Sequence, residues 1–336
     1  MAFNARYLSI MNSYQLSLAL LIVCACTLLA CEDHRTSPNA GFPQRINFTA
    51  PRQYPEGIAY SAQLDRFLVT SITQGKVGTV STSGQYEDLL TDPAFVSGNG
   101  LRVVGSKVLV CNNDQGASIK SSPATNRQLA ELLIFDLNTR RLERRIDLDD
   151  LLPAAAPNFA NDLTISPTGT IYVTDSFSPV IYQVSSSGQA SVLVRDELRF
   201  SAPLFGLNGI AYHPNGYLIV ANIGQGKLYK IDLANNNAVS EITGFGTLSG
   251  DGLALVGTTD LYVVTNNNSV TRLVSNDNFA SASVAQTDAA GYTGATTCVY
   301  VNGQLYTLNA RIGEVGAAMG DLSKLQAADY SIQRFR

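Results

Sequence analysis

The 336-residue chain is 45% hydrophobic and 15% charged, a composition that supplies a large buried core and excludes a mainly disordered protein. Its formal net charge is -4 at pH 7. We therefore expect a small or neutral partner, and neither nucleic acid nor an anionic membrane face.

The N-terminus has the pattern of a targeting segment. Residues 16–30 (LSLALLIVCACTLLA) carry no charge; they are too few to cross about 30 Å of hydrocarbon as a helix but suit a signal peptide. The segment ends in LLAC at residues 28–31, which resembles the processing box of bacterial lipoproteins. The pattern predicts a signal peptide over residues 1–30, a lipid on Cys31 and a polar tether over residues 31–45. The alternative is an ordinary signal peptide with an incidental cysteine.

This leader predicts an exported protein. We expect a cell-envelope lipoprotein on the periplasmic side or at the outer membrane, touching the membrane through its lipid only, or else a secreted protein. Glu32 follows the cysteine, which resembles lipoproteins passed to the outer membrane of Gram-negative bacteria. In a eukaryotic source, the sequons at Asn47 (NFT) and Asn267 (NNS) would matter instead.

Two cysteines remain once the leader is removed and Cys31 is lipidated. Cys111 and Cys298 lie in the apolar runs KVLVCNN and TTCVYV. Neither has the C-x-x-C spacing or the nearby histidines of a zinc or redox site, so we expect buried structural thiols.

Six similar segments follow, each with a polar residue at the start of an apolar strand. They begin PEGIAY (Pro55), GNGLRV (Gly98), ANDLTI (Ala160), LNGIAY (Leu207), GDGLAL (Gly250) and ATTCVY (Ala295). The head residues are Glu56, Asn99, Asn161, Asn208, Asp251 and Thr296. Their spacings are 43, 62, 47, 43 and 45 residues, and the long one contains a polar insertion over residues 113–128.

Each repeat continues with further short strands. Third strands read KVGTV, LLIFD, VIYQV, KLYKID and SVTRL, and fourth strands read YEDLL, LERRID, ASVLV and AVSEI. Four antiparallel strands in a period of about 45 residues, without helical periodicity, are typical of a propeller blade. We predict an all-β fold, a six-bladed β-propeller with four-stranded antiparallel blades, over residues 46–336. The segments Arg45–Thr49 and Ala328–Arg336 are candidates for closing the ring, and their pairing stays open.

The innermost strands of a propeller line a central channel, so the six head residues are expected to form a ring near the axis. Four of them carry oxygens that suit a hard divalent cation: Glu56, Asn161, Asn208 and Asp251. We expect Ca²⁺ and not Zn²⁺, which would prefer His or Cys. Asn99 and Thr296 are expected to line the channel, and Asp162 to make a local hydrogen bond. The alternative is that these are simply turn residues before glycine.

At these residues the sequence resembles the senescence-marker-protein, gluconolactonase and luciferin-regenerating-enzyme family, with the related paraoxonase and NHL-repeat propellers. The resemblance covers roughly residues 54–309 and is carried by YPEGIAY, ANDLTISPTGTIYVTD, LNGIAYHPNG and GDGLAL. It implies that Glu56, Asn161, Asn208 and Asp251 bind one divalent cation, commonly Ca²⁺. It also implies that Asp251 is the general base in lactone hydrolysis.

The sequence departs from this family at two places. Phe159, expected in the channel lining, stands where sugar-lactonase members carry an arginine that holds substrate hydroxyls, which suggests a less hydroxylated substrate or none. The channel histidine pair of paraoxonase-like members is also missing. Of the two histidines, His34 falls in the tether, and His213 is expected in a surface turn about 16 Å from the ring. We find no Ser-His-Asp triad and no G-x-S-x-G motif.

Two functions from different classes remain. The first is a monomeric, metal-dependent hydrolase of a small lactone or ester, with Asp251 as base. The second is a non-catalytic propeller that binds a protein or carbohydrate and uses the cation only to hold its blades together. The full ligand set favours the first, and the missing arginine favours the second.

Overall fold

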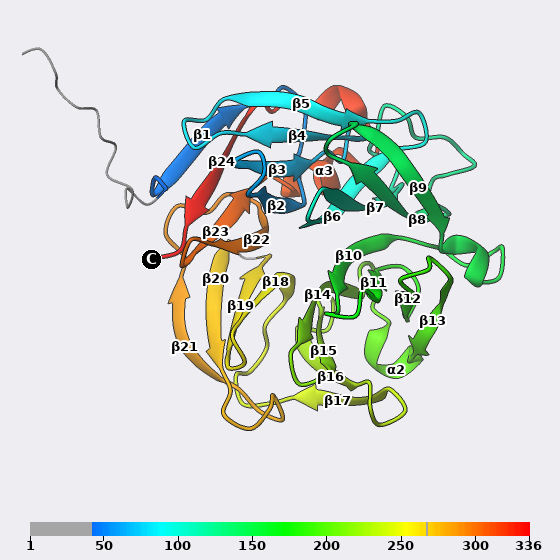
Figure 1. Ribbon diagram of the computed structural model, residues 1–336, viewed down its shortest axis with the longest axis vertical. Coiled ribbons are helices and arrows are strands. Elements are labelled where there is room, and N and C mark those ends of the chain that lie inside the picture. The colour runs from blue at the N-terminus through cyan, green and yellow to red at the C-terminus, as the bar shows by residue number, and fades with distance from the viewer. Residues whose placement is uncertain (1–41, 267) are drawn as a thin grey trace, which may run out of the picture. The chain divides into compact units, whose positions relative to one another are not determined.

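The computed structural model describes residues 42–266 and 268–336, so the predicted signal peptide and Cys31 lie outside the described residues. Residues Pro43–Arg336 form one compact unit of six four-stranded antiparallel sheets. Figure 1 shows these sheets as blades around a central axis. The prediction of a six-bladed β-propeller with four-stranded antiparallel blades is confirmed.

The blades follow one another along the chain, each running from the axis to the rim. Blade 1 contains β2 (Ile58–Ser61), β3 (Arg66–Thr70), β4 (Lys76–Val80) and β5 (Tyr86–Thr91). Blade 2 contains β6 (Ser97–Val104), β7 (Lys107–Asn113), β8 (Ala130–Asp136) and β9 (Arg141–Asp147). Blade 3 contains β10 (Ala160–Ile165), β11 (Ile171–Asp175), β12 (Val180–Val184) and β13 (Ala190–Arg195).

The remaining blades repeat this order. Blade 4 contains β14 (Leu207–His213), β15 (Tyr217–Asn222), β16 (Lys227–Asp232) and β17 (Ala238–Ile242). Blade 5 contains β18 (Gly250–Val256), β19 (Asp260–Thr265), β20 (Ser269–Val274) and β21 (Ser283–Asp288). Blade 6 contains β22 (Ala295–Val301), β23 (Gln304–Asn309), β24 (Asp329–Arg334) and β1 (Arg45–Thr49).

Short helices occur only in connections of the described chain. They are η1 (Asp149–Leu151), α2 (Glu197–Phe200), α3 (Gly313–Ala318) and η2 (Leu322–Lys324). None of the helices within residues 42–266 and 268–336 is long and apolar enough to span a bilayer.

The two ends of the described chain close the ring in blade 6. The strand order there is β22-β23-β24-β1, and β1 pairs antiparallel with β24 from Arg45 opposite Gln333 to Thr49 opposite Asp329. In Figure 1, β1 (blue) lies beside β24 (red). The pairing that the sequence left open is therefore between the two candidate segments themselves. Backbone hydrogen bonds between the two ends of the described chain therefore close the ring.

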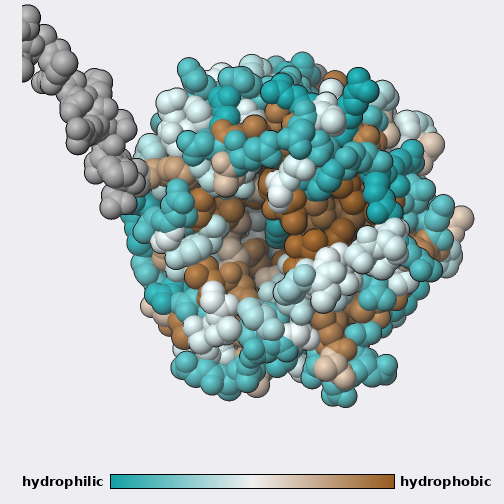
Figure 2. All heavy atoms as spheres, in the orientation of Figure 1, coloured by the Kyte–Doolittle hydropathy of each residue, from teal (hydrophilic) through white to brown (hydrophobic). Residues whose placement is uncertain are grey.

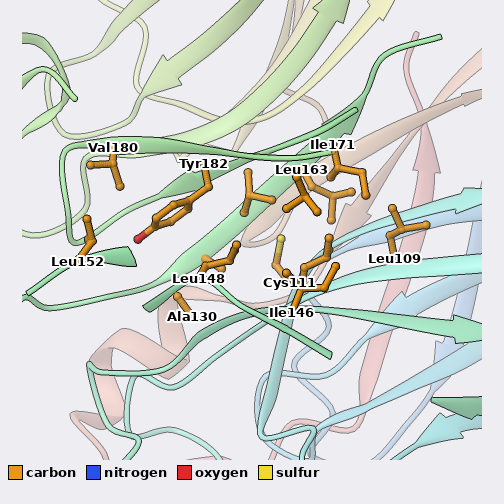
Figure 3. Close-up of a cluster of buried hydrophobic side chains, with 14 residues drawn as sticks. Leu109, Cys111, Ala130, Ile146, Leu148, Leu152, Leu163, Ile171, Val180 and Tyr182 are labelled. Carbon is orange, nitrogen blue, oxygen red and sulfur yellow. The ribbon is translucent and has the colours of Figure 1, made fainter. Parts of the chain in front are cut away.

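The hydrophobic core lies between neighbouring blades. Between blades 2 and 3, Cys111 on β7 packs with Leu163 on β10 and Tyr182 on β12 (Figure 3). Strands near the axis are covered by neighbouring blades on both faces, so β15 (YLIVAN) is buried at every position. The outermost strand β17 (AVSEI) is exposed or half-exposed except at its last residue. This difference explains why the second strands are continuously apolar while the rim strands are polar.

The two cysteines of the propeller are free and buried, as expected. Burial raises the pKa of the Cys111 thiol well above its ordinary value and that of Cys298 to about 12. Both thiols are therefore protonated and act as small apolar core side chains.

Polar residues cover the rim of the propeller. Figure 2 shows that the face turned toward the viewer is hollowed at its centre, where hydrophobic residues gather. A propeller places such a hollow where its innermost strands meet.

Candidate metal centre in the central channel

In five of the six blades, the head residue sits where the inner strand departs from regular pairing. In blade 4 the pairing of β14 with β15 shifts register between Leu207 and Ile210, so Asn208 lies in a β-bulge. The same shift occurs at the head of the inner strand in blades 2, 3, 5 and 6. In blade 1, Glu56 lies two residues before β2, which begins at Ile58. A bulge re-aims the side chain that it contains, and here it does so at the channel end of five inner strands.

The glycine after the head residue is explained by the neighbouring blade. A Cβ at Gly57 would lie 2.2 Å from the Asn99 carbonyl oxygen, and one at Gly209 would lie 2.3 Å from that of Asp251. Neither glycine has a positive φ. Asn208 and Gly209 lie within β14, residues 56 and 57 form no turn, and both glycines allow close approach between blades, so the alternative that these pairs form turns is wrong.

Five of the six head residues border one cavity of about 190 Å³. Its lining comprises Glu56, Ile72, Asn99, Gln115, Phe159, Asn161, Phe205, Asn208, Ile223, Asp251, Asn266, Ile312, Val315 and Gly316. Thr296 is not in this lining, because its buried hydroxyl donates a hydrogen bond to the Glu56 carbonyl oxygen at 2.8 Å. Side chains from blades 1, 3, 4 and 5 thus converge on a single space.

Hydrogen bonds fix the direction of two ring amides. The Ser176 hydroxyl donates to the Leu207 carbonyl oxygen at 2.5 Å, so at 2.7 Å it can only accept from Asn161 Nδ2. This leaves Asn161 Oδ1 as the free end of that amide. The Asn208 side chain donates a hydrogen bond to the Asp251 carboxylate, which opposes the effect of burial on the pKa of Asp251 without cancelling it.

The two ring carboxylates resist ionisation. Burial, with the neighbouring Asp162 carboxylate, raises the pKa of Asp251 to about 8. Burial and the charges of Asp251 and Asp162 also raise the pKa of Glu56 well above its ordinary value, while Arg102 opposes this. Both carboxylates are therefore held toward the protonated form, and a cation bound between them would favour the ionised form.

This donor set fits a hard divalent cation. Glu56 Oε2 and Asn161 Oδ1 are buried oxygens that no hydrogen-bond donor of the described residues reaches. Across residues 42–266 and 268–336, no three His, Cys, Asp or Glu side chains form a metal-binding group. The ring would therefore bind through two carboxylates, amide oxygens and water, which suits Ca²⁺ and does not suit Zn²⁺.

Asp162 makes the expected local hydrogen bond: its Oδ1 accepts from the backbone N–H of Leu163 at 2.8 Å. It also forms an ion pair with Arg102 at 3.2 Å. Arg102 lines a second cavity of about 310 Å³, which the middle and C-terminal residues of the inner strands surround. The sequence did not indicate this ion pair, because Arg102 and Asp162 belong to different repeats and share no motif.

A second set of polar residues supports the strand heads. Asp175 and Asn309 end the second strands of blades 3 and 6, and Asn112 is the next-to-last residue of the second strand of blade 2. Each accepts a hydrogen bond from a backbone N–H group that leads into the inner strand of its own blade. Burial raises the pKa of Asp175 to about 6. The recurrence of Asn or Asp at this place in the repeats could have revealed them.

The cavity roof comes from two segments outside the repeat pattern. The insertion at residues 113–128 supplies Gln115, and the connection between β23 and β24 supplies Ile312, Val315 and Gly316. The two segments pack together in one buried apolar cluster over blade 1. The sequence prediction missed these residues, since only the length of the segments set them apart.

His213 is buried, so its expected place in a surface turn is wrong. It ends β14, its Nε2 lies 2.9 Å from the Thr258 carbonyl oxygen, and its ring stacks on Tyr217 with centroids 4.1 Å apart. Burial lowers its pKa. His213 does not line the cavity and packs as a neutral core residue.

Comparisons with known proteins identify the fold. No family model and no curated protein matches the sequence. Among solved structures, the allergen Mala s 1 of Malassezia sympodialis is 17% identical with a TM-score of 0.69, and the alignment covers 87% of this chain and 96% of that one. A gluconolactonase of Xanthomonas campestris is 13% identical with a TM-score of 0.60, covering 87% and 89%.

A third similar structure is the calcium-binding protein regucalcin of Agrobacterium tumefaciens. It is 15% identical with a TM-score of 0.61, and the alignment covers 87% of this chain and 94% of that one. At these identities the likeness concerns the fold. The resemblance to gluconolactonase-type propellers that the sequence indicated is confirmed at that level.

Proposed function

We propose that this protein is a hydrolase of lactones or esters that depends on one divalent cation, with Ca²⁺ as the expected ion. The ligands are Glu56, Asn161, Asn208 and Asp251. The observation that carries this proposal is their convergence from four blades on one buried cavity that contains two unpartnered oxygens. The gluconolactonase and the calcium-binding regucalcin with the same fold support it.

The residues of the cavity have different roles in the reaction. A cation bound at the ring would polarise the carbonyl of the substrate and stabilise the oxyanion. The same cation would favour the ionised form of Asp251, which takes a proton from water while the water oxygen bonds to the carbonyl carbon. The carbon–oxygen bond to the leaving oxygen then breaks, and the proton passes from Asp251 to that oxygen. The apolar side chains of the lining exclude other water from this step.

Metal content tests the binding part of the proposal. After equilibration with Ca²⁺ and removal of free ion, elemental analysis should find close to one Ca²⁺ per chain. Asp251→Asn should lose it, because one of two carboxylate ligands is gone. Asp329→Asn, which removes an exposed carboxylate on β24, should keep it. Wild-type protein that retains no ion would contradict the site.

Turnover tests the chemistry. On a panel of aliphatic and aromatic lactones and esters, chelation of the cation should abolish hydrolysis, and Asp251→Asn should lower kcat by at least about 100-fold. Hydrolysis that survives Asp251→Asn would refute the base. A protein that holds Ca²⁺ and hydrolyses nothing would instead be the non-catalytic binding propeller.

We also propose that the chain is a monomeric lipoprotein of the cell envelope, anchored at Cys31. The basis is the LLAC box that follows the apolar leader at residues 16–30. Mass spectrometry of the mature protein should find a lipidated cysteine as its first residue. A mature chain that begins elsewhere would contradict this.

A further inference from the structure

The cavity has a polar floor and apolar walls. The walls consist of Ile72, Phe159, Phe205, Ile223, Ile312 and Val315. Outside the strand-head ring, the polar side chains of the lining are the amides of Gln115 and Asn266. We infer that the cavity accepts a lactone or ester with an apolar body and rejects polyhydroxylated lactones, and that Phe159 determines this selectivity. This inference rests on the hydrolase function proposed above.

Hydroxyl groups on the substrate would find few partners on these walls. A hydroxyl buried against the half-buried side chains of Phe205 or Ile223 loses its hydrogen bonds to water and gains none. In an otherwise apolar pocket, an added hydroxyl costs up to about 100-fold in specificity. A lactone ring that carries several hydroxyls would therefore be excluded from the cavity.

Phe159 belongs to a rigid aromatic cluster. Its side chain is 1% exposed, and its ring centroid lies 4.9 Å from that of Phe177 and 5.8 Å from that of Phe205. The Arg127 guanidinium carbon lies 4.0 Å from the centroid of the Phe177 ring. The backbone N–H of Phe159 donates to the Asp175 carboxylate at 3.0 Å. The apolar wall is thus formed before any ligand binds, which lowers the entropy lost on binding.

The cavity volume limits the size of the buried part. An apolar cavity of about 150 Å³ holds one benzene molecule, which has six non-hydrogen atoms. At about 190 Å³ the present cavity holds at most roughly eight such atoms, because a bound cation and a water would share it. A five-membered lactone ring with two further carbons is therefore the upper limit for the buried part of the substrate.

A matched series of five-membered lactones tests the inference on the full-length protein with Ca²⁺. The series carries hydrogen, methyl, ethyl or hydroxymethyl at the ring carbon next to the ring oxygen. We expect kcat/KM to rise about fourfold for each of the first two carbons and to fall by 10-fold or more from ethyl to hydroxymethyl. Equal or better hydrolysis of the hydroxymethyl lactone would overturn the inference.

Variants then test which residues of the cavity wall determine the selectivity. Phe159→Leu should lower kcat/KM for the ethyl lactone by about 10-fold and leave the hydroxymethyl lactone little changed. Phe200→Leu is the matched control, because Phe200 is equally buried but packs on Tyr229, outside the cavity lining. If Phe159→Leu does not fold, Ile223→Thr adds a hydroxyl to the wall and should favour the hydroxymethyl lactone by about 10-fold. An unchanged preference in the variant that folds would overturn the role of these walls.

A binding experiment separates this inference from the proposed function. Cyclopentanones with the same substituents cannot be hydrolysed, and titration calorimetry measures their affinity directly. Chain-length dependence of this affinity without any lactone hydrolysis would support the apolar site and refute the hydrolase. Lactone hydrolysis without preference for alkyl groups would support the hydrolase and refute the apolar site.

Discussion

Replacing Gly209 by alanine tests how closely the blades approach one another at the metal centre. The added Cβ would lie 2.3 Å from the Asp251 carbonyl oxygen and 2.9 Å from the Leu253 backbone nitrogen. These neighbours belong to the next blade, and backbone atoms cannot rotate away, so blade 5 must shift. Overpacking of this kind costs about 1–3 kcal/mol, and we expect the upper half of that range. In a chain of this size, that corresponds to a loss of roughly 3–5 °C in Tm.

The assay compares Gly209→Ala with Gly313→Ala in thermal unfolding and in Ca²⁺ affinity. A Cβ at Gly313, in α3, would meet nothing within 4 Å, so this variant should match or slightly exceed the wild type in stability. Gly209→Ala should also weaken Ca²⁺ binding, because Asp251 moves with its backbone. Equal unfolding temperatures for the two variants would refute the reasoning.

Two further predictions concern the supports of the cavity. Tyr54→Phe removes the hydroxyl that donates to Glu314 Oε2 at 2.7 Å and accepts from Ala327 N at 3.1 Å, so it should cost about 1–2 kcal/mol and speed hydrogen exchange in residues 311–328. Unchanged exchange there would contradict the role of Tyr54 in the roof. Asp175 has a folded-state pKa of about 6, above its ordinary value, so the stability that it contributes is present below about pH 4 and is lost as the pH rises through 6. Asp175→Asn cannot ionise; the stability of the wild type relative to this variant, measured by urea unfolding, should fall by on the order of 2–3 kcal/mol between pH 4 and 7. A constant or rising difference would contradict the raised pKa.

Much of the fold could be predicted because each blade repeats the same hydrophobic pattern. The segments KVGTV, VIYQV, KLYKID and AVSEI coincide with β4, β12, β16 and β17. Strand β21 was not predicted, since five of its six residues are exposed and show no alternation. Helix α3 was not predicted either, because it has only six residues, two of them glycine.

The candidate site, too, could be predicted from the sequence only in part. The convergence of Glu56, Asn161, Asn208 and Asp251 follows from their equivalent places in the repeat. The roof does not follow, because the segments that carry Gln115 and Val315 have no counterpart in other blades and pack through tertiary contacts. His213 was misplaced because its nearby Pro-Asn-Gly turn indicated exposure, whereas its ring packs on aromatic neighbours.

A crystal structure of the protein grown with Ca²⁺ tests the central claim most directly. We predict one ion on the propeller axis, with oxygens of Glu56, Asn161, Asn208 and Asp251 at about 2.3–2.6 Å from it. Crystals that contain Ca²⁺ elsewhere, or none at the ring, would contradict the metal centre and the hydrolase built on it.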